Sequence, residues 1–270
     1  MQVQQQDTAV SMKIMEQVEV LTPTQDGRTM VLGRTGSGKS TLQDNLLLRY
    51  LALYPTARVL IIDSKPRFKA EYSTSGNTAE RHYKKWSRGN FLQGSYRLEN
   101  KGDIKPQLDT IWRKRGRVAI AQTRPGDLAD LAWLEGVARV FYGSYSDKTP
   151  RLIMIDELAD FFEVRRSGGI FHQAARSGRE LGIGMLAGSQ RPSYIPTVVM
   201  TESDRLYLFN LDYSEDMKKV HQMGVPKDVA APSVDHSFFY WNKFTKFSGA
   251  SGKYYILDLG DKKNGTHQKA

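Results

Sequence analysis

Residues 31–41 constrain this chain more than any other stretch. From Gly33 to Ser40 they fit the pattern G-x-x-x-x-G-K-[ST]. A short apolar run that predicts a strand, residues 29–33, leads into the glycines, and apolar residues at helical spacing follow over residues 40–53. A strand, a glycine-rich loop and a helix in this order predict a phosphate-binding loop within an α/β domain, whereas a chance glycine turn would not need both flanking elements.

The residue types of this loop have a physical reason. Such a loop directs consecutive backbone N–H groups and the positive end of a helix at a di- or triphosphate. Gly36 and Gly38 are needed because a side chain there would block the close approach of the backbone. Lys39 is expected to reach the β- and γ-phosphates and the Ser40 hydroxyl to bind Mg²⁺, so ATP and Mg²⁺ are the expected cofactors. The expected nucleotide-binding residues are Gly33, Arg34, Thr35, Gly36, Ser37, Gly38, Lys39, Ser40 and Thr41.

Composition sets the class of protein. The chain has 270 residues, of which 40% are hydrophobic, enough for one substantial core. It has no cysteine, so neither disulfides nor thiolate metal sites are expected. No apolar run is long enough to cross a bilayer, and the first residues lack the features of a signal peptide. We expect a soluble protein that is not secreted, with an N-terminal arm (1–28), one ATPase domain (29–259) and a polar tail (260–270).

The positive charge is unevenly distributed. The net charge is +10, and residues 64–117 alone hold 14 Lys/Arg against 5 Asp/Glu, interspersed with aromatic residues. A basic, aromatic-rich region of this kind favours contact with a polyanion, and nucleic acid is the obvious one. The alternative is a solvated surface that only aids solubility. Beside a nucleotide-binding loop, we favour nucleic acid.

Apolar runs and helical spacing predict the remaining elements. Buried strands are expected at 58–63, 118–122, 152–155, 183–189 and 205–211, with a short strand at 94–99. Helices are expected from 127 to about 142, at 170–181 and at 215–223, and a closing hairpin at 236–241 and 253–259. Strands that alternate with helices predict a mostly parallel central sheet covered on both faces.

The strand at 152–155 ends in two carboxylates, Asp156 and Glu157, and fits a Walker B element. Asp156 is expected to hold Mg²⁺, and Glu157 to orient and deprotonate the water that attacks the γ-phosphate. Strands often end in acidic residues, so the interpretation depends on the phosphate loop upstream. The strands at 58–63 and 183–189 also lead into polar residues, Asp63 and Gln190, where ligands collect in parallel sheets.

The order of these pieces resembles the FtsK–HerA superfamily of DNA-pumping ATPases. The likeness spans about residues 29–211 and is carried by residues 33–40, 61–65, 153–157 and, most specifically, 175–192, which end in Gln-Arg-Pro. It implies an α/β fold of the P-loop NTPase (RecA-like/ASCE) type. It also implies a homo-oligomer, usually a hexameric ring.

The resemblance assigns roles to matching residues. Gln190 corresponds to a polar sensor of the γ-phosphate or the attacking water. Arg179 falls where related proteins place an arginine finger, which acts on the neighbouring subunit's nucleotide. Arg176 is the alternative finger, and a surface salt bridge is the alternative role for either arginine. Asp63 and Lys65 match an Asp-x-Lys pattern for which a structural role is plausible.

The sequence also departs from much of this superfamily. We expect no N-terminal β-barrel, no winged helix and no membrane helices beside the ATPase domain. A bare motor of this size resembles the genome-packaging ATPases of tailless icosahedral double-stranded DNA viruses with internal membranes. This resemblance implies double-stranded DNA as a partner, together with capsid-vertex or inner-membrane proteins. The implied location is the host cytoplasm or the packaging vertex of the virion. Arg165, Arg166 and parts of 64–117 are the expected DNA contacts.

Three other functions stay open on the sequence. The same motor in plasmid conjugation or chromosome partition would rely on partners for the missing domains. A nucleotide-dependent switch or small-molecule kinase would be a monomer whose ATPase activity ignores DNA. A non-enzymatic DNA-binding protein with a vestigial fold is disfavoured because Lys39, Asp156 and Glu157 are all intact.

Overall fold

A computed structural model of the chain describes residues 23–64, 68–73, 91–100, 102–122, 128–143, 149–162, 169–233, 236–243 and 247–251. Within them the chain forms one sheet with the strand order β10-β9-β8-β1-β7-β6-β2-β5-β4-β3. The strands are β1 (Arg28–Leu32), β2 (Arg58–Asp63), β3 (Lys69–Ser73), β4 (Phe91–Arg97), β5 (Val118–Gln122), β6 (Arg151–Ile155), β7 (Ile183–Ser189), β8 (Arg205–Leu208), β9 (Phe238–Asn242) and β10 (Phe247–Ser251). The helices are α2 (Lys39–Leu53), α3 (Ile104–Arg113), α4 (Leu128–Gly143), α5 (Ile170–Ser177), α6 (Thr197–Thr201) and α7 (Ser214–Gln222).

The sheet is parallel from β3 to β8, and the C-terminal hairpin extends it. β1 pairs with β7 on one side and β8 on the other, and β6 pairs with the far side of β7. β9 is antiparallel to β8, and β10 is antiparallel to β9. β7 therefore lies between the strand that leads into the glycine loop and the strand that ends immediately before Asp156. The predicted α/β class, with a mostly parallel sheet, is confirmed.

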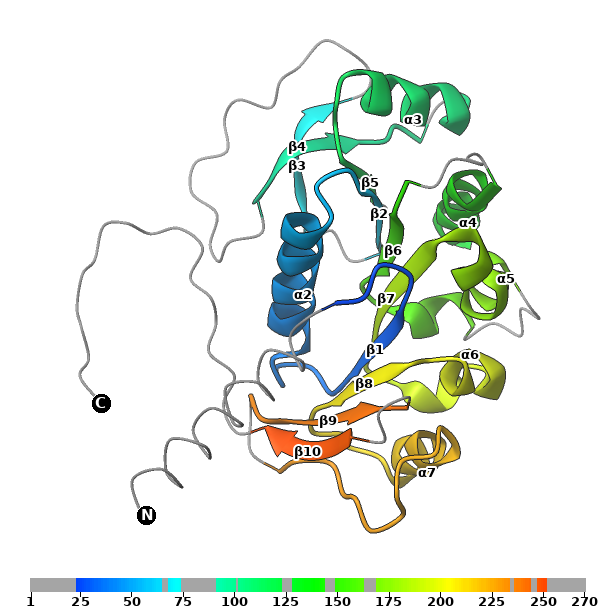
Figure 1. Cartoon of the computed structure of the whole chain (residues 1–270). Coiled ribbons are helices and arrows are strands. Elements are labelled where there is room, and N and C mark those ends of the chain that lie inside the picture. Colours follow the sequence, from blue (N-terminus) through cyan, green and yellow to red (C-terminus); the bar gives the residue numbers. More distant parts are fainter. Residues whose placement is uncertain are drawn as a thin grey trace, which may run out of the picture.

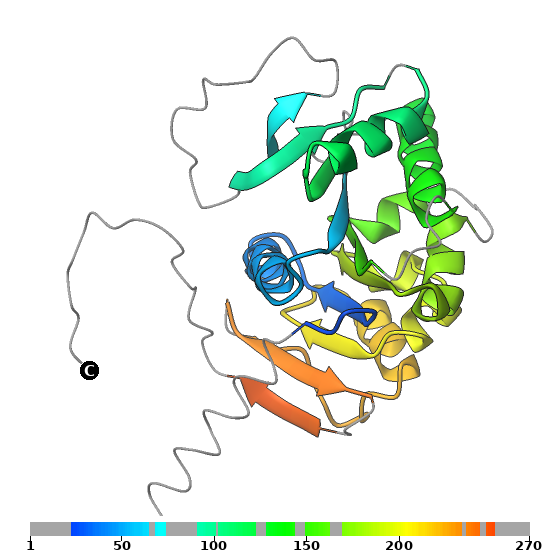
Figure 2. The ribbon, with the colours of Figure 1, turned by 45° about the horizontal axis from the view of Figure 1, so that its top comes forward.

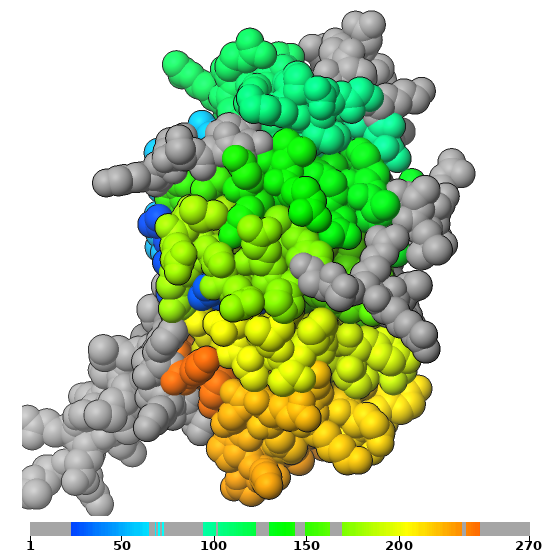
Figure 3. All heavy atoms as spheres, turned by 90° about the vertical axis from the view of Figure 1, so that its right-hand side faces the viewer, coloured from blue at the N-terminus to red at the C-terminus, as the bar shows by residue number. Residues whose placement is uncertain are grey.

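Helices cover both faces of the sheet. Helix α2 packs on one face, and helices α3 to α7 pack on the other (Figure 1, Figure 2). Seen from that second face, α3 to α7 form a continuous layer along the sheet (Figure 3). The central strands are buried throughout because both of their faces lie against helices. None of the helices in the described ranges is long and apolar enough to cross a membrane.

Four details differ from the sequence prediction. The second strand of the hairpin is β10, at 247–251; residues 253–259, where we expected it, lie outside the described part of the chain. The predicted helix 170–181 ends at Ser177, and a 3-10 turn (Arg179–Leu181) and Gly182, with φ 65°, lead into β7. Helix α3 was not predicted, although its buried residues Ile104, Leu108 and Ile111 have helical spacing. Strand β3 was not predicted either.

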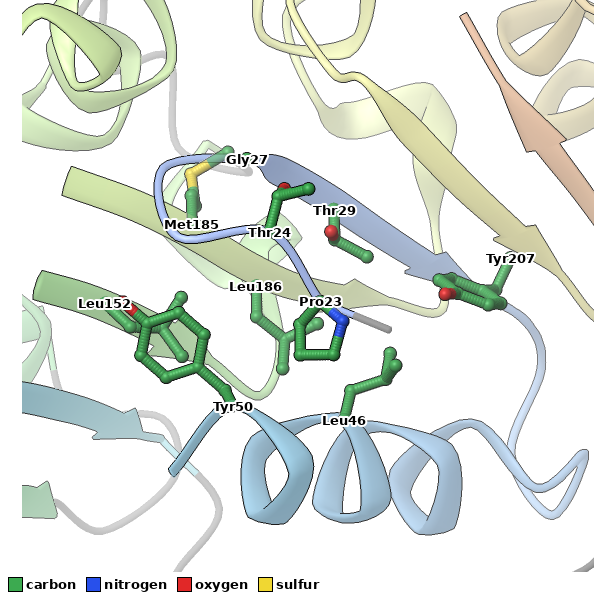
Figure 4. A pocket seen from close by; sticks show the side chains of 10 residues that line it. All are labelled: Pro23, Thr24, Gly27, Thr29, Leu46, Tyr50, Leu152, Met185, Leu186 and Tyr207. Carbon is green, nitrogen blue, oxygen red and sulfur yellow. The ribbon is translucent and has the colours of Figure 1, made fainter. Parts of the chain in front are cut away.

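The segment 23–27, at the end of the predicted N-terminal arm, lies on the sheet between β7 and the C-terminal half of α2 (Figure 4). The Tyr50 hydroxyl donates to the Gln25 carbonyl at 3.0 Å, and the Met185 amide donates to the Gly27 carbonyl at 2.9 Å. Burial raises the pKa of the Tyr50 phenol, which therefore stays protonated and keeps its donor. A small pocket lined by Pro23, Leu46 and Tyr207 lies beneath this segment (Figure 4). This part of the arm is thus tied to the ATPase domain.

Three arginines at the starts of strands bind the C-terminal ends of helices. Arg117 donates to the carbonyls of Leu51 and Tyr54, at the end of α2, at 2.7 Å each. Arg151 donates to the Leu181 carbonyl at 2.8 Å and to the Tyr142 carbonyl, in the last turn of α4, at 3.5 Å. Similarly, Arg28 donates to the Arg176 carbonyl of α5 at 3.4 Å. Guanidinium groups suit these positions because the last carbonyls of a helix carry partial negative charge.

Arg151 gives a test of this arrangement, because its side chain is 1% exposed. Arg151→Met keeps much of the side-chain volume but leaves buried carbonyls without a donor. The free energy of unfolding should therefore fall by about 2 kcal/mol or more. Arg139→Met removes an exposed arginine that pairs with Glu135 on α4 and should change it by less than about 0.5 kcal/mol. Urea unfolding of both variants measures the difference, and equal stabilities would contradict the structural role of Arg151.

Candidate nucleotide-binding site

The glycine loop runs from the end of β1 to the start of α2. Gly36 and Gly38 have φ of 80° and 100°, a conformation that favours glycine. The Gly33 amide donates to the Ser189 carbonyl of β7 at 3.1 Å, and the Arg34 amide donates to the Asn210 carbonyl beyond β8 at 2.8 Å. A Cβ at Gly33 would lie 2.6 Å from the Cβ of Phe209, so only glycine fits there. The strands on both sides of β1 thus fix the loop.

Lys39 and Ser40 begin helix α2, where the sequence predicted them. Lys39 is the first residue of α2 and is only 5% exposed. The first turn of α2 contains no acidic residue, so nothing in that turn neutralises the positive end of the helix dipole. This helix end and the backbone amides of the loop favour an anion such as a phosphate group.

Asp156 and Glu157 follow β6 at the same edge of the sheet. They are 6% and 3% exposed, and the Asp156 amide donates to the Ile62 carbonyl of β2 at 3.2 Å. Both carboxylate oxygens of Glu157 accept from the backbone amide of Gln190, at 2.9 and 3.2 Å. This contact fixes the orientation of the Glu157 carboxylate at the edge of the sheet.

Gln190 joins the glycine loop to Glu157. Its side-chain oxygen accepts a hydrogen bond from the Thr35 hydroxyl at 2.9 Å, while its backbone amide holds Glu157. The structure therefore brings together three of the predicted elements: the loop, the carboxylates after β6 and the polar residue after β7. Thr35 was predicted only as a loop residue, and this side-chain contact is additional.

The donor set fits a magnesium ion bound together with phosphate. Ser40 and Asp156 offer a hydroxyl and a carboxylate, the oxygen ligands that Mg²⁺ prefers. The described ranges contain no cluster of three or more His, Cys, Asp or Glu residues that could hold a metal ion. Mg²⁺ at such a site keeps several waters and takes further ligands from a nucleotide, instead of sitting in an all-protein cage.

Arg179 does not join this group of residues in its own chain. It follows α5 and precedes β7, and its Nη2 atom lies 2.5 Å from the Asp204 carboxylate at the start of β8. Asp204 also accepts from the backbone amide of Arg28 at 2.9 Å, so Arg179 lies at the amino-terminal edge of the sheet. The Arg179 side chain is 40% exposed. Arg176 is exposed as well.

Asp63 has structural hydrogen bonds that explain its position. The side chain is fully buried, and Oδ2 accepts from the Phe68 amide and from the Gln122 side chain at 2.9 Å each. It thereby joins the ends of β2 and β5 to the start of the next segment. Lys65, Arg165 and Arg166, the other residues named from the sequence, lie outside the described part of the chain.

Sequence reasoning did not find a cluster of aromatic and charged side chains next to Gln190. The Arg191 guanidinium lies over the rings of Tyr213 and Tyr194, 4.2 and 4.7 Å from their centroids. Its Nε atom is 3.4 Å from the fully buried carboxylate of Asp216 on α7. Cation–π and ionic contacts thus fix the turn after Gln190. No sequence pattern indicated this cluster because β8 separates its two segments.

The arrangement has counterparts among solved structures. The genome-packaging NTPase B204 of Sulfolobus turreted icosahedral virus 2, in complex with AMP, matches at a TM-score of 0.56 and 14% identity, covering 86% of this chain and 100% of that chain. Its complex with ATP-gammaS matches at 0.54 and 12%, covering 86% and 99%. The cytoplasmic domain of the Thermomonospora curvata type VII secretion ATPase EccC matches at 0.50 and 14%, covering 90% and 28%.

This chain has the P-loop NTPase fold. At these identities the likeness extends to the fold alone. No protein-family model matches the sequence, and comparison with curated proteins finds no significant match. The chemistry that this chain can perform follows from the arrangement of its own residues, from Gly33 to Lys39 and around Glu157.

Binding of Mg-ATP should stabilise the folded chain, and Lys39 should be required for it. A ligand at about 100 times its Kd adds about 2.7 kcal/mol, which corresponds to a rise in Tm of about 5 °C or more for a chain of this size. Lys39→Ala should lose most of that rise because the phosphates lose their buried cation. Lys105→Ala removes an exposed lysine of α3, and this variant should keep the full rise in Tm with Mg-ATP. Differential scanning fluorimetry with and without Mg-ATP measures the shifts, and equal shifts in both variants would contradict the site.

Proposed function

We propose that this protein is an ATPase that moves double-stranded DNA, and that it packages a viral genome into a preformed capsid. The observation that carries the proposal is the assembly of Lys39, Glu157 and Gln190 around one glycine loop. The side-chain contact from Thr35 to Gln190 links the phosphate-binding loop directly to the residue that holds Glu157. A loop that only bound nucleotide would not need a buried carboxylate held in this way.

The proposed reaction is hydrolysis of the γ-phosphate. Ser40 and Asp156 would hold Mg²⁺, which would supply positive charge to the phosphates when bound, and Lys39 neutralises charge on the same phosphates. Glu157 accepts a proton from water as the water oxygen bonds to the γ-phosphorus. The bond from that phosphorus to the β–γ bridging oxygen breaks, which gives ADP and inorganic phosphate. Gln190, hydrogen bonded to both Thr35 and Glu157, is placed to respond to the presence of the γ-phosphate.

Arg179 supplies the second part of the site in this proposal, from a neighbouring copy of the chain. Its guanidinium lies at the amino-terminal edge of the sheet and is 40% exposed, whereas the glycine loop is at the carboxyl edge. An arginine in this place can reach a nucleotide only in another subunit. A closed ring, for which we propose six subunits, gives every site such a neighbour. In the isolated chain Asp204 pairs with Arg179 instead.

Charge and fold support DNA as the substrate. The net charge is +10, and the end of α3 and the turn after it expose three consecutive basic residues, Arg113, Lys114 and Arg115. Part of the basic charge of 64–117 has another use, because Arg117 binds the end of α2. The viral setting is proposed from the likeness in fold to B204, a genome-packaging NTPase. Capsid-vertex or inner-membrane proteins are the proposed docking partners, in the host cytoplasm or at the packaging vertex of the virion.

Stimulation of ATP hydrolysis by DNA tests the function. Purified chain should release phosphate faster with double-stranded DNA than without it, and a mass measurement with nucleotide and DNA should find a ring. DNA affinity should fall by at least about tenfold between 0.05 and 0.2 M salt, whatever the sequence, because phosphate contacts release counterions.

The matched control for this experiment is Glu157→Gln. This variant should bind Mg-ATP and DNA as the wild type does but hydrolyse ATP at least about a hundredfold more slowly. A monomer whose phosphate release ignores DNA would contradict DNA translocation and favour a nucleotide-dependent switch. Stimulation by DNA without any capsid partner in the neighbouring genes would favour the plasmid or chromosome setting. Stimulation by a polypeptide in place of DNA would favour a secretion role.

Mixing of two inactive variants tests the role of Arg179. Lys39→Ala removes the phosphate contact on one side of the shared site, and Arg179→Ala removes the finger on the other. Mixed rings contain some sites with both residues intact, so part of the ATPase activity should return on mixing. If activity stays absent at every ratio, Arg179 does not act across a subunit boundary.

A further inference from the structure

Gln43 is a buried polar residue of α2 that the proposed reaction does not yet use. It follows Lys39 by four residues and Ser40 by three, so it lies on the same face of the helix, one turn further along. Its side chain is 0% exposed. Residues of this type are seldom fully buried, because the amide must then find partners inside the protein.

The Gln43 amide reaches across to the strand that carries the carboxylates. Its Nε2 atom donates to the carbonyl of Ile155 at 3.2 Å. Ile155 is the last residue of β6 and immediately precedes Asp156. The hydrogen bond therefore joins the helix that presents Lys39 and Ser40 directly to the backbone that presents Asp156 and Glu157.

Gly188 of β7 provides the space for this contact. A Cβ at Gly188 would lie 2.6 Å from Nε2 of Gln43 and 2.5 Å from the backbone oxygen of Asp156. No other residue type fits without displacing one of these groups. Because β7 lies between β1 and β6, the absence of a side chain here is what allows α2 and the end of β6 to meet across it.

Packing alone does not explain a glutamine at this position. Its second amide atom, Oε1, is buried and accepts no hydrogen bond from any residue that the structure describes. A buried, unpaired acceptor lowers the stability of the folded chain, so leucine or methionine would suit the helix–sheet interface better. Polar groups that a protein keeps although they lower its stability are typical of functional sites.

We propose that Gln43 is a positioning residue for the magnesium ligands: its hydrogen bond to Ile155 sets the position of Asp156 and Glu157 relative to Ser40. The proposal rests on the ATPase function proposed above. Groups behind a metal ligand fix its orientation, and their loss usually weakens metal binding or activity without removing any ligand.

Gln43→Met tests this role, since methionine fills similar volume but cannot donate to the carbonyl. We expect kcat for ATP hydrolysis to fall by about tenfold or more. The Mg²⁺ concentration that gives half of the maximal rate should rise. We also expect KM for ATP to change by less than about twofold, because the glycine loop and Lys39 are intact. Asn45→Leu is the matched control: Asn45 also lies on α2, but in the described part of the chain its side chain hydrogen bonds only within the helix, to the Thr41 carbonyl at 2.9 Å. Its kcat and Mg²⁺ dependence should match those of the wild type.

If Gln43→Met and Asn45→Leu have the same kcat and the same Mg²⁺ dependence, the positioning role is wrong. If Gln43→Met does not fold, Gln43→Glu replaces it. A protonated glutamic acid can donate to the Ile155 carbonyl, but the carboxylate cannot. The ratio of its kcat to that of the wild type should therefore rise as the pH falls, and a ratio independent of pH would contradict the proposal.

A further measurement separates this proposal from the proposed function. Mg²⁺ should add to the rise in Tm that ATP gives the wild type, and Gln43→Met should lose that addition but keep the rise from ATP alone. This readout needs no hydrolysis. A wild type that binds Mg-ATP without hydrolysing it would contradict the ATPase, whereas an unchanged Mg²⁺ effect in Gln43→Met would contradict the role of Gln43.

Discussion

The parallel direction of the central strands is the constraint from which the rest of this structure follows. Because each helix returns the chain to begin another parallel strand, the helices run opposite to the strands. The carboxyl ends of the strands and the amino ends of the helices therefore meet at one edge of the sheet. The carboxyl ends of β1, β6 and β7 therefore bring together Gly33, Asp156 and Gln190, which are far apart in the sequence. The positive end of α2 lies at the same edge, where it suits an anion.

At the opposite edge of the sheet the negative ends of the helices lie together, and their partial charge requires cationic partners there. Arg28, Arg117 and Arg151 bind those carbonyls and thereby use part of the basic charge inside the fold. A count of lysine and arginine in the sequence cannot separate such residues from those on the surface. The high positive charge of the chain is thus partly a property of its architecture, and only the exposed remainder is available to a polyanion.

The sequence predicted the parts of the fold where local pattern and burial agree. The strands around residues 30, 60, 120, 153 and 186 are buried on both faces, so continuous apolar runs identified them. β10 was missed because an edge strand needs only backbone hydrogen bonds, and Phe-Ser-Gly-Ala-Ser resembles a loop. Within the candidate site, motifs identified Lys39, Glu157 and Gln190. They did not reveal Gln43 or the cluster around Arg191, because these roles arise from contacts between distant segments.

Asp204 connects two regions that the proposed function treats separately. One carboxylate oxygen accepts from the backbone of Arg28 and pairs with Arg179, so the start of β1 and the proposed finger share one anchor. The polypeptide preceding β1 enters the sheet at this same edge, over Tyr50 and Met185. Movement of Arg179 towards a neighbouring copy, as proposed above, would therefore leave Arg28 as the remaining ion-pair partner of Asp204 in the described part of the chain.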